Sequence, residues 1–154
     1  MRKRKTCWYL LFGLYCAAML YLLFARTEAS GDLSHWEQMC LRINLVPFRT
    51  IRRQFLRLFD LDKAWQVHHS VINLAGNVVL FAPMGIFLPK LFPALNRLWK
   101  VLAVTALTIT AVELTQVLTL LGRCDIDDLI LNTLGAALGY GLYKWMQKDS
   151  SRKS

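Results

Sequence analysis

The sequence predicts an all-α membrane protein: an antiparallel bundle of about four transmembrane helices, with an amphipathic interfacial helix in the first outer loop. Three observations support this fold class. Of the 154 residues, 55% are hydrophobic. The apolar residues form long blocks, without the polar stripe of a soluble helix. Lys and Arg residues flank these blocks.

The net charge of +9 does not indicate nucleic-acid binding. Basic residues that bind nucleic acid cluster on one face of a domain, where they neutralise phosphates. Here they lie at the ends of apolar blocks, as membrane topology requires. We therefore expect membrane lipids as partners and no nucleic acid.

The first apolar block, Cys7 to Ala25, has about the ~20 residues that cross a bilayer, and it follows a basic segment at residues 1–6. A secretory signal peptide also begins with basic residues, and Ala25 to Ser30 would then hold the cleavage site. The block is long for a signal peptide, which favours a retained anchor.

Three further blocks complete a membrane domain at residues 7–146. They cover Val71–Leu91, Leu98–Leu121 and Ile126–Met146. The short links between them predict antiparallel neighbours. Residues 26–70 form an outer loop, and residues 147–154 form a cytoplasmic tail that ends in a polar, disordered stretch. The basic N-terminus places both termini in the cytoplasm, with a modest Lys and Arg excess on that side.

Within the outer loop, the segment from Phe48 to Phe59 places apolar side chains at helical spacing on one face and basic side chains mainly on the other. Its basic residues are headgroup-binding candidates: Arg49, Arg52, Arg53 and Arg57. One interpretation is an interfacial helix whose guanidinium groups lie among lipid phosphates. The other is a helix that caps the bundle, with solvated arginines. Both remain open.

Polar side chains inside spans are costly, so each needs a reason. Those of the last three spans are Asn73, Asn77, Glu113, Gln116, Asp125, Asp127, Asp128 and Asn132. Alternating span direction and a rise of ~1.5 Å per residue place them in one leaflet, with Asn77 and Asn132 about 9 Å and Glu113 about 12 Å from the span ends. Such convergence indicates either a functional cleft or a structural network of interhelical hydrogen bonds.

Two smaller features concern packing and redox state. Gly135 and Gly139 lie four apart and predict close approach of a neighbouring helix. Cys40 and Cys124 fall on the same side in the predicted topology, so a disulfide between them remains open.

Several ordered motifs resemble the VanZ-like family over residues 41–146. They are Asn44-Leu45-Val46-Pro47-Phe48, the segments at residues 73–77 and 81–85, Glu113 to Gln116, and Arg123 to Asp128 running on to Gly135. The resemblance implies a bacterial membrane protein of a family named for a member linked to teicoplanin resistance. It implies no mechanism. The motif residues are therefore ligand-binding candidates: Asn44, Pro47, Phe48, Asn73, Asn77, Glu113, Gln116, Arg123, Asp125, Asp128 and Asn132.

We expect a non-enzymatic protein that binds or excludes an anionic ligand at the outer leaflet, such as a lipid-linked cell-wall precursor or a lipoglycopeptide. The alternative is an intramembrane hydrolase or transferase that uses Glu113, Asp125 and Asp128, with Arg123 stabilising negative charge. No cofactor or metal is expected, because His68 and His69 are adjacent and point about 100° apart on a helix. A proton-linked transporter is a third class, with Glu113 as its titrating group.

Overall fold

The computed structural model describes residues 2–25 and 33–152 of the chain. In chain order the elements are α1 (Arg2–Phe24), α2 (His35–Leu41), β1 (Ile43–Asn44), α3 (Arg49–Arg57), a 3-10 turn (Leu61–Lys63), α4 (Ala64–Leu91), a second 3-10 turn (Pro93–Leu95), α5 (Leu98–Leu118), β2 (Cys124–Asp125) and α6 (Ile126–Arg152). The predicted cleavage site and part of the outer loop, at residues 26–32, lie outside the described residues.

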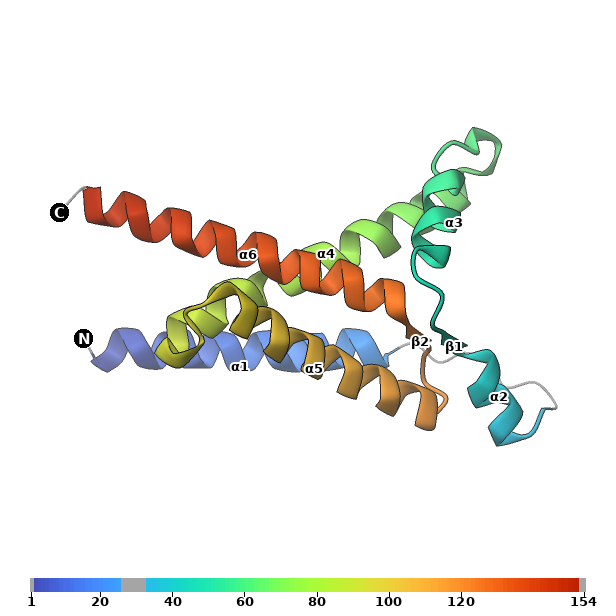
Figure 1. Cartoon of the computed structure of the whole chain (residues 1–154), viewed down its shortest axis with the longest axis horizontal. Coiled ribbons are helices and arrows are strands. Elements are labelled where there is room, and N and C mark those ends of the chain that lie inside the picture. The colour runs from blue at the N-terminus through green and yellow to red at the C-terminus, as the bar shows by residue number, and fades with distance from the viewer. Residues whose placement is uncertain (1, 26–32, 153–154) are drawn as a thin grey trace.

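The long helices share two ends (Figure 1). We call one the terminal end, because α1 begins and α6 finishes there, next to the link between α4 and α5. The other is the ladder end, where α2, α3 and the two short strands lie. Helices consecutive among α1, α4, α5 and α6 alternate in direction (Figure 1).

Three helices of the described chain are long and apolar enough to cross a membrane: Lys5–Phe24, Ala64–Leu91 and Leu98–Leu118. These correspond to the first three predicted spans, although α4 begins seven residues before the expected Val71. The predicted fourth span lies within α6, which carries acidic residues in its first turn and is not among those three. Helix α6 also continues to Arg152, so part of the tail that we expected to be disordered is helical.

The closest helix pair, α4 and α6, is not consecutive in sequence. The two helices run in the same direction and cross (Figure 1). Their backbones touch at glycines: a Cβ at Gly135 would collide with the Val78 carbonyl, one at Gly139 with the Ala82 carbonyl, and one at Gly85 with the backbone of α6. The close approach predicted at Gly135 and Gly139 is confirmed, since only a missing Cβ lets these backbones meet.

Helix α1 packs on the second half of α4 through aromatic side chains. Phe12 and Tyr15 stack on each other and both contact Phe87. The Tyr15 hydroxyl donates to the Leu80 carbonyl of α4 at 2.9 Å. The buried core continues inward through Phe81, Ile109 and Ala136.

Candidate functional site

Two motifs about 80 residues apart meet at the ladder end. Strand β1 pairs in parallel with β2, so that Ile43 lies opposite Cys124 and Asn44 opposite Asp125. The Cys124 amide donates to the Arg42 carbonyl at 2.9 Å. Arg42 itself is buried, and its guanidinium donates to the Leu120 and Gly122 carbonyls. The ladder therefore ties the outer loop to the segment between α5 and α6.

The Asp125 carboxylate is fully engaged in this junction. One oxygen, Oδ1, accepts from the Asn44 amide and from the Asp127 backbone N–H, both at 3.0 Å. The other accepts from the Thr50 hydroxyl at 2.6 Å. Asp125 is 9% exposed. Its role in this arrangement is structural, because hydrogen-bond donors around a buried carboxylate offset the cost of removing it from water.

Asp127 caps helix α3 from another part of the chain. Its fully buried carboxylate accepts three backbone N–H bonds, from Phe48 at 2.5 Å, Thr50 at 2.6 Å and Ile51 at 3.0 Å. The first N–H groups of a helix have no partner within the helix, and the N-cap residue Phe48 supplies no side-chain bond. Phe48 also adopts a left-handed backbone with φ of 62°, which turns the chain into α3. The charge of Asp127 therefore anchors the first turn of α3 to the first turn of α6.

The anchored helix presents its arginines to the surroundings. Exposed side chains on α3 include Arg49, Arg52, Arg53 and Arg57. The apolar face is only partly covered, because Phe55 is 53% exposed and Leu56 57% exposed. A second attachment joins α3 to α4, where the buried Ser70 hydroxyl donates to Gln54 at 2.7 Å.

A second polar group lies beside this junction, between the long helices. The Asn77 amide of α4 donates to the Asp128 carboxylate of α6 at 2.5 Å. Glu113 of α5 is 7% exposed, and the Cys124 thiol donates to its Oε2 atom at 3.5 Å. Asp125 and Asp128 lie near Glu113. We call Asn77, Glu113 and Asp128 the interhelical cluster.

Several buried oxygens near this level accept no hydrogen bond from the described residues. They are Oδ1 of Asn44, Asn73 and Asn132 and Oε1 of Glu113. Asn132 follows Asp128 by one helical turn, and Asn73 precedes Asn77 by one turn. The interhelical cluster thus still has an oxygen that can accept a hydrogen bond. The Asp125 and Asp127 carboxylates, in contrast, already accept hydrogen bonds from the outer loop.

Other predicted site residues lie apart from the interhelical cluster. Gln116 donates to the Leu23 carbonyl at 2.7 Å and so joins α5 to α1. Pro47 and Arg123 are exposed. Cys40 is an exposed free thiol, and Cys124 is a free, partly buried one.

The Cys124 thiol is kept in its neutral form. Burial, together with the adjacent Glu113 carboxyl, raises its pKa to about 11. Cys124 is therefore a hydrogen-bond donor to Glu113 at neutral pH and a poor nucleophile. Over the described residues, no group of three or more His, Cys, Asp or Glu side chains is arranged to hold a metal ion.

Two residues of this junction, Arg42 and Thr50, were not identified from the sequence, and neither was the role of Asp127 as a cap of α3. The run Asp125-Ile126-Asp127-Asp128 at a helix start does indicate capping carboxylates. However, the pattern suggests that they serve their own helix, whereas Asp127 serves α3. Nothing local to Arg42 or Thr50 signals a partner 75 or more residues away.

The sequence of the chain is similar to that of known proteins. The family model described as VanZ/LLP1 matches residues 12–147. The chain is 29% identical to "Protein VanZ" of Enterococcus faecium over 143 residues, which covers 93% of this chain and 77% of that protein. No solved structure matches significantly.

Proposed function

The chain belongs to the VanZ/LLP1 family, and from this premise we propose that it acts at the outer leaflet of a bacterial cell membrane as a non-enzymatic protein that binds or excludes an anionic ligand. In this proposal α1, α4, α5 and α6 all cross the bilayer. The ladder end faces outward, and both termini lie in the cytoplasm, as the basic N-terminal residues favour.

The observation that carries the proposal is the fixed position of α3. Four exposed arginines lie on a helix that Asp127 anchors to α6 and that Ser70 and Gln54 join to α4. Guanidinium groups bind phosphate and carboxylate in a forked geometry. Anchoring the helix lowers the ordering cost of presenting several such groups together.

The exposed apolar face of α3 favours the interfacial interpretation over the capping one. A helix that only capped the bundle would bury Phe55, Leu56 and Phe59 against other helices, yet all three are more than half exposed. In the headgroup region these side chains would reach the acyl chains while the arginines meet phosphates. Membrane lipids are thus the first partners that we propose.

The ligand class that best fits is a lipid-linked cell-wall precursor or a lipoglycopeptide. Both combine an anionic group with an acyl chain, which matches the arginines and apolar side chains of α3. The family resemblance, which implies a member linked to teicoplanin resistance, extends the proposal to teicoplanin-type resistance.

The test combines binding with antibiotic susceptibility. We expect purified protein in nanodiscs to bind a lipid-linked precursor or teicoplanin, with affinity falling roughly fivefold for each of Arg52→Gln and Arg53→Gln. Lys63→Gln is the matched control, because Lys63 lies just beyond α3 and pairs with Asp60 at 3.4 Å. Expression in a susceptible bacterium should raise teicoplanin tolerance for wild type and the control only. Equal loss in the control, or binding of neither compound, would refute the proposal.

One observation keeps the enzymatic alternative open. Glu113 Oε1 is buried without a partner, and the Asp128 carboxylate lies near it. Two neighbouring carboxyl groups can share a proton and act as general acid and base. Asp125 is a weaker candidate, since its carboxylate is occupied by Asn44, Thr50 and Asp127. Turnover of a lipid-linked substrate by wild type and not by Glu113→Gln would favour the enzyme.

A further inference from the structure

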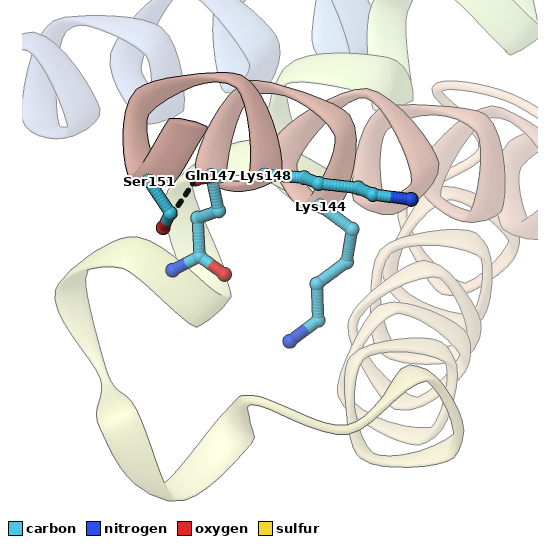
Figure 2. A pocket seen from close by; sticks show the side chains of 4 residues that line it. All are labelled: Lys144, Gln147, Lys148 and Ser151. Atoms are coloured by element: carbon cyan, nitrogen blue, oxygen red, sulfur yellow. Dashed lines mark hydrogen bonds between the residues drawn. The ribbon is translucent and has the colours of Figure 1, made fainter. Parts of the chain in front are cut away.

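A shallow pocket of about 600 Å³, largely open to the surroundings, lies at the terminal end, far from the interhelical cluster. It is lined by Lys144, Gln147, Lys148 and Ser151, which share one face of α6 (Figure 2). Figure 2 shows Lys144 and Gln147 extending from α6 toward the link between α4 and α5. No acidic side chain is among these lining residues.

Lys144 is held in a defined position beside this pocket. Its ammonium donates to the Asn96 side-chain oxygen in the link at 2.9 Å. The same group lies 5.6 Å from the Tyr140 ring centre and 5.9 Å from that of Tyr143. These contacts leave part of its donor capacity for a ligand, because an ammonium group has three N–H bonds.

Lys148 adds a second positive charge one turn further along α6. Its side chain is exposed, and it makes no ion pair or hydrogen bond within the part of the chain that the structure describes. Gln147 and Ser151 already make hydrogen bonds within α6. The Gln147 amide donates to the Tyr143 hydroxyl at 2.6 Å, and the Ser151 hydroxyl donates to the Gln147 carbonyl at 3.1 Å. The two lysines therefore determine which ligand the pocket attracts.

The position of the pocket along α6 matches the headgroup region of a bilayer. Helix α6 rises about 27 Å between Ile126 and Lys144, at ~1.5 Å per residue. The hydrocarbon core is about 30 Å thick. With the start of α6 near one surface, Lys144 and Lys148 reach the opposite one. Lys90 in the last turn of α4 and Lys100 in the first turn of α5 add positive charge on either side of the link between these helices, and basic residues near a membrane surface attract anionic lipid.

We propose that this pocket binds the phosphate of an anionic phospholipid from the leaflet at the terminal end. The phosphate would lie between the two lysine ammonium groups, while the acyl chains follow the exposed apolar surface of α6, which includes Leu142 and Trp145. This site is separate from the outer-leaflet function proposed above, and neither depends on the other.

Lipid retention by the full-length protein tests the proposal. The protein would be purified in a neutral detergent and titrated with phosphatidylglycerol, phosphatidylcholine or inorganic phosphate, with bound lipid read by native mass spectrometry. We expect phosphatidylglycerol to bind and the other two not to. Lys144→Gln or Lys148→Gln should each lower that affinity roughly fivefold, and the double variant roughly 30-fold.

Lys100→Gln is the matched control, because Lys100 lies at the same end, donates to the Ala94 carbonyl at 2.8 Å and does not line the pocket. If it weakens binding as much as the pocket variants, attraction to the basic surface explains the result and the pocket is refuted. Retention of phosphatidylcholine, or equal binding of phosphate alone, would also refute a phospholipid site. Since Lys144→Gln also breaks the bond to Asn96, Lys148→Gln decides the outcome if the first variant misfolds.

Discussion

Removing the Asp127 carboxylate should release α3 from the helical bundle. In Asp127→Ala, three N–H groups at the start of α3 lose their acceptor, and the N-cap residue Phe48 makes no side-chain hydrogen bond that could replace it. A hydrogen bond to a charged group contributes about 1.5 to 3 kcal/mol, and the three bonds share one carboxylate. We therefore expect the local stability of α3 to fall by about 3 kcal/mol.

Hydrogen exchange of the backbone amides measures this local opening directly. A loss of about 3 kcal/mol corresponds to exchange roughly a hundredfold faster, because each 1.4 kcal/mol is a factor of about ten. The effect should be confined to residues 48–57, while amides in α5 keep their protection. Asp127→Asn retains one acceptor oxygen and should lie between wild type and Asp127→Ala.

Asp128→Asn is the matched control for this prediction. It removes a charge from the same first turn of α6 and so carries the same penalty at the helix N-terminus. However, its carboxylate accepts a hydrogen bond from Asn77 of α4. If Asp128→Asn accelerates exchange in α3 as much as Asp127→Ala does, or if neither variant changes it, the Asp127 carboxylate does not hold α3 in position and the reasoning is wrong.

Two further predictions concern packing and thiol chemistry. Gly139→Leu should separate α4 from α6 and destabilise the protein in detergent by more than about 2 kcal/mol, because the new side chain meets the α4 backbone. Gly141→Ala, whose Cβ meets nothing, should be neutral or slightly stabilising, and equal thermal unfolding of both variants would contradict the packing. Maleimide should modify exposed Cys40 before Cys124 at neutral pH, with the Cys124 rate rising as the pH approaches its pKa of about 11. Equal rates at neutral pH would show that Cys124 is not shielded.

The sequence by itself determined the membrane class, the first three long helices and the amphipathic helix of the outer loop. Each depends on properties that are local to the chain: block length, hydropathy and the spacing of Arg and Phe between Phe48 and Phe59. The close helix contact at Gly135 and Gly139 could be predicted for the same reason, because a missing side chain permits close approach whatever the partner helix is.

Only the tertiary structure decided the partners of the polar groups. Asp127 and Asp128 are adjacent in one helical turn, yet one binds α3 and the other α4, because side chains one residue apart point about 100° from each other. Gln116 similarly turns to α1, although it lies one turn from Glu113. Which helix faces each side chain follows from the crossing of α4 and α6, a contact between segments about 50 residues apart that no local pattern specifies.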